Sequence, residues 1–279
     1  MMEQQNRVWF ITGSSRGFGR VWTEAALKRG DKVVATARKL ESISDFSEKY
    51  GDQVLPLELD VTKPEQVKEA VQKAHIHFGK LDIVLNNAGY SLVGTIEEAT
   101  ADEIRALYET NIIGPVSVIQ AALPILRAQG SGHILGTSSN IGHFTLPVLG
   151  YYSSSKWAFE AIHESLAEEV KQFGIKVTII EPGAYATEFG SQESLKFAGN
   201  IEAYTALKTE FIKNLSSFEQ GDPNATAQAL FKVIDAENPP LRFNMGSHNL
   251  PLIKGVYAER IALWELWDEV SRSAQGNKG

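Results

Sequence analysis

Short apolar, β-branched runs alternate along this chain with longer segments of helical periodicity. The runs are nearly all apolar, with no alternation of polar residues, and they span Val8–Thr12, Lys32–Ala37, Val54–Leu59, Leu81–Leu85, His133–Thr137 and Lys176–Glu181. Strands of this character are typical of a parallel sheet that is covered by helices on both faces. Because parallel strands need crossover connections, the intervening helices are expected on both sides of one sheet. The pattern predicts an α/β fold with a single Rossmann-type, doubly wound parallel sheet flanked by helices.

The helical segments between these runs are expected at Gly19–Arg29, Pro64–Phe78 and Ala101–Ala128. No linker-like shift in composition and no internal repeat interrupts the series, so residues 1–279 are interpreted as one domain. One stretch, Thr187–Glu219, departs from the alternation, since it is first polar and then helical. We expect it to form a helical lid over a site, with a surface insertion as the alternative.

The series then resumes with a helix (Ala225–Ile234) and a strand (Leu241–Met245), and a C-terminal extension covers about residues 250–279. Within the extension we expect a helix at Val256–Ser271. Its apolar residues recur at spacings of three and four, which is typical of a face that packs against protein: Tyr257, Ile261, Trp264, Trp267 and Val270. The stripe predicts core packing or a subunit interface, and a cap over the substrate is the alternative.

Charge and cysteine content narrow the possible partners. The chain has 27 Lys and Arg residues against 34 Asp and Glu residues, a net charge of −7, so no nucleic-acid partner is expected. With no cysteine, disulfides, thiolate metal sites and cysteine nucleophiles are all absent, and no metal site is predicted. The apolar stretch Ile112–Leu126 contains Pro115, Gln120 and Pro124 and is shorter than the about 20 residues of a membrane span. These observations predict a cytoplasmic protein without a membrane partner.

A glycine-containing turn follows the first predicted strand. It reads Gly13-Ser14-Ser15-Arg16-Gly17-Phe18-Gly19 and leads directly into a helical pattern. Glycine allows the backbone to approach a diphosphate, and the free N–H groups of the helix that follows point at the anion. The spacing differs from both G-x-G-x-x-G and the P-loop. Its position after the first strand nevertheless predicts dinucleotide binding, with a structural turn as the alternative.

The end of the second predicted strand bears on which dinucleotide is bound. Position 37 is Ala, where an acidic residue would accept hydrogen bonds from a ribose, and Arg38 follows. A guanidinium suits a 2′-phosphate, and Arg16 in the glycine turn could approach the same group. We therefore expect NADP(H) to be favoured over NAD(H), unless Arg38 is simply a solvated strand end.

Tyr152 and Lys156 are spaced i, i+4, so a helix would place both side chains on one face. Ser139, 13 positions before Tyr152, closes the strand at His133–Thr137, where open α/β sheets gather their ligands. An ammonium about 4 Å from the phenol is expected to lower the phenol pKa by roughly three units, towards the range of effective general acid–base catalysis. Tyr151 is five positions from Lys156 and lies off that face, so Tyr152 is the candidate.

Taken in order, these motifs resemble those of the short-chain dehydrogenase/reductase family, in the branch of the 17β-hydroxysteroid dehydrogenases. The resemblance runs from Val8 to about Thr187. The matching motifs are Thr12-Gly13-x-x-x-Gly17-x-Gly19, Asp60-Val61, Asn86-Asn87-Ala88-Gly89, Asn111, Ser139, Tyr152-x-x-x-Lys156 and Pro182-Gly183-x-x-x-Thr187.

The resemblance implies a role for each catalytic position. Tyr152 would exchange a proton with the substrate oxygen, Ser139 would orient that oxygen, and Lys156 would lower the pKa of Tyr152 and hold the nicotinamide ribose. Asn111 would hold a water that links Lys156 to solvent. The cofactor-binding set expected from the turn, from Arg38 and from the resemblance is Gly13, Ser15, Arg16, Gly17, Phe18, Gly19, Arg38, Asp60, Val61, Asn87, Ala88, Gly89, Tyr152, Lys156, Pro182, Gly183 and Thr187.

The sequence therefore predicts an NADP(H)-dependent oxidoreductase that interconverts a secondary alcohol and a ketone or aldehyde. The residues expected to line the pocket are apolar or aromatic, which favours such a small-molecule substrate: Tyr90, Leu92, Phe144, Leu146, Val148, Tyr185 and Phe189. The alternatives are an epimerase or dehydratase with a bound nicotinamide, and a catalytically silent nucleotide-binding protein. By resemblance, a homodimer or homotetramer is expected through the long central helices, here Ala101–Ala128 and Tyr152–Phe173.

Overall fold

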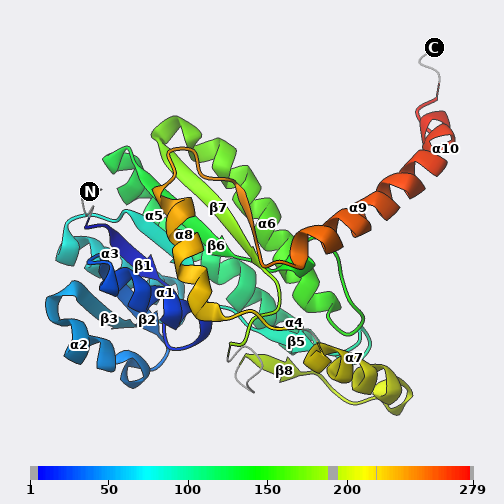
Figure 1. The fold of residues 1–279 in the computed structure, drawn as a ribbon, viewed down its shortest axis with the longest axis horizontal. Helices are drawn as coiled ribbons and strands as arrows, with labels where there is room; N and C mark the ends of the chain where they lie inside the picture. The colour runs from blue at the N-terminus through cyan, green and yellow to red at the C-terminus, as the bar shows by residue number, and fades with distance from the viewer. Residues whose placement is uncertain (1–5, 188–193, 218, 277–279) are drawn as a thin grey trace.

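Seven parallel strands form the central sheet of this computed structural model, which describes residues 6–187, 194–217 and 219–276. The strand order is β3-β2-β1-β4-β6-β7-β9 (Figure 1). The strands are β1 (Val8–Ile11), β2 (Lys32–Ala37), β3 (Val54–Glu58), β4 (Ile83–Asn86), β6 (Gly132–Thr137), β7 (Ile175–Pro182) and β9 (Arg242–Met245). The predicted doubly wound parallel sheet is confirmed, and the strand ends differ from the prediction by at most two residues.

Helices cover both faces of this sheet (Figure 1). On one face, buried residues of α1 (Gly17–Lys28), α2 (Asp45–Tyr50) and α8 (Thr226–Asp235) share a core with Trp9 and Leu85. On the other face, α3 (Pro64–Phe78), α5 (Gly114–Gln129) and α6 (Gly150–Val170) share a core with Phe10 and Ile134. The alternating strands therefore bury apolar side chains on both sides, as the near-continuous apolar runs predicted. Short helical turns lie at Leu40–Ile43, Gly51–Gln53, Asn140–Gly142, Lys171–Phe173, Glu202–Tyr204 and Pro223–Ala225.

The single helix predicted over Ala101–Ala128 is instead three helical segments. α4 (Ala101–Tyr108) leads into a π-helical turn at Glu109–Ile113, and α5 follows it. By length and composition alone, the continuous run 101–129 could cross a bilayer. In the fold, the apolar character of this run is explained by packing, because Val118, Ala122 and Leu126 of α5 are buried against the sheet.

The segment predicted as a lid begins with a strand. β8 (Leu195–Phe197) pairs in parallel with β5 (Ser91–Val93) in a small second sheet, and α7 (Thr205–Ser217) follows. Periodicity alone did not identify these two strands, because each is only three residues long. Phe189, which we expected to line the pocket, lies outside the described residues.

The C-terminal helix α9 (Asn249–Leu266) begins seven residues earlier than predicted, and α10 (Asp268–Ser273) follows it. α9 leaves the body of the molecule and carries the chain away from it (Figure 1). Its apolar stripe is exposed, with 46% of Ile261, 64% of Trp264 and 57% of Trp267 accessible. The stripe was predicted to pack in the core or to form a subunit interface. Packing in the core is wrong, because no described element covers this half of the helix.

Candidate active site

The sheet order brings three of the predicted motifs together at the carboxyl ends of neighbouring strands. β1, β4 and β6 are neighbours, and the loops at their carboxyl ends carry the glycine turn, Asn87 and Ser139 respectively. In an open α/β sheet this edge is where ligands bind. The residues that follow each strand therefore form one candidate site.

The backbone of the turn after β1 requires glycine. Gly13 and Gly17 have φ values of 73° and 53°, in the left-handed region. A Cβ on Gly19 would lie 2.1 Å from the carbonyl oxygen of Gly13, so no side chain fits there. α1 begins directly after this tight turn, and the N-terminus of a helix favours an anion, so the turn fits a dinucleotide diphosphate.

Asn87 connects this turn by hydrogen bonds to the loop after β4. Its side-chain Nδ2 donates to the carbonyl oxygens of Thr12 at 3.0 Å and Gly13 at 3.2 Å. In return, Thr12 Oγ1 accepts from the backbone nitrogens of Asn87 at 2.9 Å and Ala88 at 3.0 Å. Thr12 is part of the matching motif, but the motif alone does not predict this structural role.

Arg16 and Phe18 make contacts that the sequence did not predict. Arg16 Nε donates to Ser194 Oγ at 3.0 Å, which directs this nitrogen towards the segment before β8. Phe18 stacks on Trp22 with ring centroids 4.9 Å apart and meets Tyr185 edge-on at 5.2 Å. Phe18 therefore packs α1 against its neighbours.

Arg38 lies at the carboxyl end of β2 and is exposed. Within the part of the chain that the structure describes, it forms no ion pair. Ser15, in the glycine turn, is half-buried. The charge of Arg38 is therefore available to an anionic ligand at this edge of the sheet.

Asp60 and Val61 follow β3 and shape their own loop. Asp60 Oδ1 accepts hydrogen bonds from the backbone nitrogen of Thr62 at 3.0 Å and from its hydroxyl at 2.8 Å. Val61 is buried against the start of α5, where a Cβ on Gly114 would lie 2.8 Å from its Cγ2. Both residues lie in the loop after β3, on the same side of the parallel sheet as the glycine turn after β1.

Tyr152, Ser139 and Lys156 meet where β6 ends beside the first turns of α6. Ser139 is hydrogen-bonded to the Tyr152 phenol. Lys156 Nζ donates to the carbonyl oxygen of Thr137 at 2.8 Å and lies 5.8 Å from the centre of the Tyr152 ring. Tyr151 points elsewhere, because its hydroxyl donates to the carbonyl oxygen of Ile96 at 3.0 Å.

The phenol pKa of Tyr152 was expected to be lowered, and this prediction is wrong. Burial raises the pKa of the Tyr152 phenol above its usual value, and the hydrogen bond with Ser139 opposes only part of that rise. Burial also lowers the pKa of Lys156 to about 8, although the charge of Glu160 partly offsets the effect. An ammonium about 4 Å from the phenol was expected to lower the phenol pKa, but Nζ donates instead to the carbonyl oxygen of Thr137, and desolvation dominates both pKa values.

Asn111 lies in the π-helical turn and is buried. Its side chain exchanges hydrogen bonds with the backbone of Tyr90, at 3.1 Å to the nitrogen and 2.9 Å to the oxygen, and donates to Ser155 Oγ at 3.0 Å. A Cβ on Gly89 would lie 3.2 Å from Asn111 Oδ1 and 3.8 Å from Lys156 Nζ, so the absent side chain leaves space beside both groups. π-Helical turns are frequent at functional sites.

The last predicted cofactor motif follows β7. The backbone nitrogen of Gly183, next to Pro182, donates to the carbonyl oxygen of Met245 at 3.0 Å, and a Cβ on Gly183 would lie 2.5 Å from Asn249 Oδ1. Thr187 reaches the glycine turn, since its Cβ is 3.7 Å from the position of a Cβ on Gly17. The segment after β7 therefore passes beside the start of α1.

Half of the described residues predicted to line the pocket surround Tyr152. Phe144, Leu146 and Val148 share an apolar cluster with Tyr152 and with Ile253 of α9. The other three lie elsewhere: Tyr90 and Leu92 pack around Leu107, and Tyr185 packs against Phe18. β5 and the segment after β7 therefore place these three side chains in packing clusters separate from the one around Tyr152, and their part in the pocket stays a prediction.

Val148 has a φ of 62°, the sole positive value recorded for a non-glycine residue in the described ranges. A β-branched residue in this region costs about 1–3 kcal/mol and is held there by its surroundings. Val148 is buried in the cluster around Tyr152, and its carbonyl oxygen accepts from the backbone nitrogen of Gly94 at 2.8 Å. The strain therefore lies beside the candidate proton donor.

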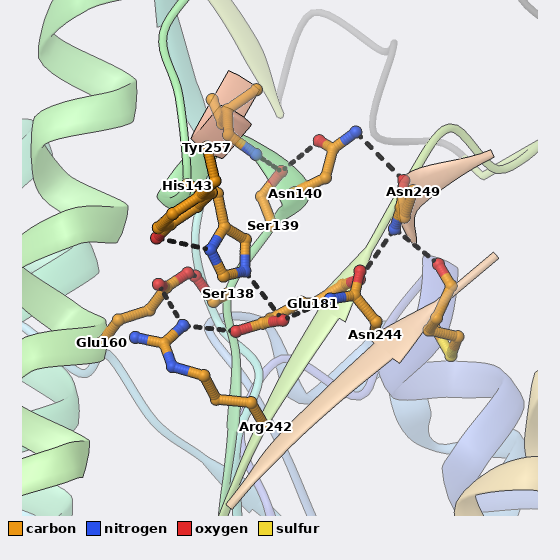
Figure 2. A network of polar contacts seen from close by, with 12 residues as sticks. Ser138, Ser139, Asn140, His143, Glu160, Glu181, Arg242, Asn244, Asn249 and Tyr257 are labelled. Atoms are coloured by element: carbon orange, nitrogen blue, oxygen red, sulfur yellow. Dashed lines mark hydrogen bonds and ion pairs between the residues drawn. The ribbon is translucent and has the colours of Figure 1, made fainter. Parts of the chain in front are cut away.

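A buried charged network supports the loop that carries Ser139 (Figure 2). Glu160, one helical turn after Lys156 on α6, accepts from Ser138 Oγ at 2.5 Å and from Arg242 Nη1 at 2.7 Å. The same nitrogen of Arg242 is hydrogen-bonded to Glu181 on β7. Burial raises the pKa of Glu160, and the bonds with Ser138 and Arg242 oppose that rise.

His143 connects this network to α9. Its Nε2 lies 2.9 Å from Glu181 Oε2, its Nδ1 lies 3.3 Å from the Tyr257 hydroxyl, and its carbonyl oxygen accepts from Arg260 at 2.7 Å. His143, Glu160 and Glu181 have ligand-type atoms within 4.8 Å of one another. Arg242 already bridges the two carboxylates and supplies the compensating positive charge. This network was not predicted from the sequence. The i, i+4 spacing of Lys156 and Glu160 could have indicated that Glu160 lies on the same helix face as Lys156.

Comparison with known proteins gives consistent results. Residues 7–196 match the family model described as short chain dehydrogenase. The oxidoreductase BOA17 of Botryotinia fuckeliana is 40% identical over 95% of this chain and 98% of its own length. The NADPH-dependent 3-dehydrocapnine reductase of Ornithobacterium rhinotracheale is 38% identical over 88% of this chain and 90% of its own length.

Solved structures agree in fold. A short-chain dehydrogenase from Streptomyces avermitilis has a TM-score of 0.90 and 36% identity, over 97% of this chain and 99% of its own. A short chain dehydrogenase from Burkholderia cenocepacia in complex with NADP has a TM-score of 0.74 and 27% identity, over 95% and 98%. A Burkholderia phymatum structure in complex with NAD has the same fold, with a TM-score of 0.81 and 23% identity over 95% and 96%.

Proposed function

Since the chain belongs to the short-chain dehydrogenase/reductase family of oxidoreductases, we propose that it transfers a hydride between NADP(H) and the carbon of a secondary alcohol, ketone or aldehyde. The observation that carries the proposal is the meeting of Ser139, Tyr152 and Lys156 beside the glycine turn. The branch that resembles 17β-hydroxysteroid dehydrogenases is part of the same proposal.

The side chains divide the proton chemistry between them. In reduction, Tyr152 donates its phenolic proton to the substrate oxygen, and Ser139 orients that oxygen by a hydrogen bond. Burial keeps the phenol protonated, which is the form that a donor needs. Lys156, held at Thr137, then stabilises the phenolate that remains, and Asn111 lies beside the route by which the proton is replaced. The nicotinamide, when bound, supplies or accepts the hydride.

The glycine turn and the N-terminus of α1 would hold the diphosphate, and Lys156 would hold the nicotinamide ribose. Asp60 and Val61 would border the adenine, and Pro182, Gly183 and Thr187 the nicotinamide. The preference for NADP(H) is supported by the exposed Arg38 beside Ala37 at the end of β2, since a guanidinium binds phosphate in two-pronged geometry. The NADPH-dependent relative is in line with this preference.

An apolar or aromatic substrate is supported by the cluster of Phe144, Leu146, Val148 and Ile253 around Tyr152. The segment from Thr187 to Glu219 would act as the lid. It is fastened to the loop after β5, because Glu98 accepts from the backbone of Ile201 at 2.9 Å and pairs with Lys208 of α7 at 2.6 Å. These contacts join the lid segment to the loop after β5.

We also propose a homodimer or homotetramer through α4–α5 and α6. The exposed side chains of Ile113 and Trp157 on these helices support that interface. A cytoplasmic location is proposed from the absence of cysteine.

The main test compares wild-type protein with Tyr152→Phe. A panel of ketones, aldehydes and alcohols is screened by following the absorbance of the reduced nicotinamide. With an accepted substrate, loss of the proton donor is expected to slow turnover about 10²- to 10⁴-fold, while NADPH binding remains. Tyr151→Phe, which removes the neighbouring phenol, is the matched control. An unchanged rate in Tyr152→Phe would refute the role, and turnover without net consumption of NADPH would indicate an epimerase or dehydratase.

Arg38→Ala tests the cofactor preference. The variant is expected to bind NADPH about 10- to 150-fold more weakly, which corresponds to roughly 1.5–3 kcal/mol for hydrogen bonds to a charged group. NADH binding is expected to change little. Lys39→Ala, at the next exposed position, is the control. If the NADPH/NADH ratio of dissociation constants stays constant in Arg38→Ala, the 2′-phosphate is bound elsewhere.

A further inference from the structure

Among the residues that the structure describes, the C-terminal arm, residues 249–273 of α9 and α10, contacts the body through its inner half, residues 249–260. Ile253 is buried beside Tyr152, and Asn249 donates to the carbonyl oxygens of Glu181 and Met245. Arg260 marks the end of the attachment, with its guanidinium 5.2 Å from the Trp157 ring. Every residue from 261 to 270 is exposed.

The exposed surface of the arm is unusually apolar for a helix in water. Nine large apolar side chains are between 40% and 77% accessible: Leu250, Leu252, Tyr257, Ile261, Leu263, Trp264, Leu266, Trp267 and Val270. With roughly 100 Å² exposed on each, they present about 900 Å², since a large side chain offers about 150–250 Å². These side chains lie around the whole helix, and together they expose more apolar surface than the roughly 300–600 Å² of the largest patch on an ordinary monomer.

Charge narrows the choice of partner. Residues 261–273 carry Glu265, Asp268 and Glu269 against one basic residue, Arg272, a net charge of −2, which disfavours an anionic membrane or a nucleic acid. The inner half has the opposite balance, because Lys254 and Arg260 outnumber Glu259. Two copies of the arm side by side in antiparallel directions would therefore place the acidic half of each along the basic half of the other.

We propose that the C-terminal arm pairs with the arm of a second copy of this chain around a twofold axis, in antiparallel orientation. A twofold interface uses the same surface on both partners. The outer half of each arm, at Trp264 and Trp267, then covers the middle of the other, where Tyr257 and Ile261 are exposed. This interface is separate from the one proposed for α4–α5 and α6, and it does not depend on the proposed reaction.

The first experiment measures the mass of the purified full chain by light scattering over a range of concentrations. The double variant Trp264→Glu, Trp267→Glu is expected to have half the mass of the wild-type assembly. Ile76→Glu places the same charge on another exposed apolar residue, 82% accessible on α3, and is expected to keep the wild-type mass. Equal masses for wild type and the double variant would overturn the proposal.

Orientation is tested by cross-linking, because the natural chain has no cysteine. Copies with Lys254→Cys are mixed with copies with Ser271→Cys under mild oxidation. Antiparallel arms are expected to give disulfide-linked dimers in the mixture and none from Ser271→Cys alone. Dimers from Ser271→Cys alone, with none in the mixture, would overturn the orientation. Phosphatidylcholine–phosphatidylserine vesicles are expected not to sediment the wild-type protein, and sedimentation that is lost in the double variant would assign the arm to a membrane.

Discussion

At the residue scale, burial favours the neutral forms of both Tyr152 and Lys156. It raises the pKa of the phenol and lowers the pKa of the ammonium to about 8. For Lys156 the folded value lies below the unfolded value of 10.5, so the unfolded chain binds the additional proton between these two pH values. The stability that comes from this residue is therefore present at high pH and is lost as the pH falls through 8.

Lys156→Met is expected to remove this pH dependence. The free energy of unfolding of the wild type, minus that of the variant, should rise by roughly 2–3 kcal/mol between pH 8 and pH 10. Urea unfolding at pH 7, 8, 9 and 10 measures the difference. Lys171→Met, at an exposed lysine, serves as the control and should show a constant difference. A flat difference for Lys156→Met as well would mean that Lys156 is solvated in the folded protein.

Sequence spacing was sufficient to identify Tyr152 and Lys156 as neighbours, but it could not give the direction of their pKa shifts. Among the apolar groups around Tyr152, Val93 and Ile253 come from distant segments. Their closeness depends on the tertiary fold. The same holds for Arg242, which lies 82 positions after Glu160 and contacts it only because β9 pairs with β7.

At the element scale, Arg242 ties β9 to β7 and α6 through ion pairs with Glu160, Glu164 and Glu181. Arg242→Met should destabilise the fold by about 3–5 kcal/mol, because two buried carboxylates lose their counterion. The loss should be greater at pH 8 than at pH 5, since burial already raises the pKa of Glu160 and the acid form tolerates burial. Urea unfolding of both proteins at the two pH values measures it.

Arg272→Met is the matched control, because Arg272 pairs with Asp268 on the exposed arm. Its effect should stay within about 1 kcal/mol, as for most surface pairs. If Arg242→Met also costs less than 1 kcal/mol, the buried carboxylates are neutral without their partner.

The strands of the main sheet were predictable because their apolar runs are long enough to be recognised, whereas the small elements were not. β5 and β8 have three residues each and pair with one another across about 100 positions. The π-helical turn at Glu109–Ile113 leaves no break in the helical pattern, so the sequence predicted one helix there. Elements of this kind are set by tertiary contacts.

At the scale of the whole molecule, segments far apart in the chain share each core. β1, the first strand, lies in the middle of the sheet, and β9, the last, lies at one edge. Trp9 of β1 packs in one cluster with Ile180 of β7 and Leu230 of α8. A boundary drawn anywhere between these elements would cut through a core, and the single domain stays a prediction.

The chain is therefore expected to unfold in one cooperative transition. Trp9 and Trp22 are buried in the N-terminal half, so tryptophan fluorescence reports on that half, while far-UV circular dichroism reports on all helices. Trp157→Phe, Trp264→Phe and Trp267→Phe remove the exposed indoles of α6 and of the arm, which would otherwise contribute a signal unrelated to the N-terminal half. In this background, urea transitions followed by the two methods should share one midpoint. A fluorescence change that precedes or follows the loss of helix would show two units that unfold separately.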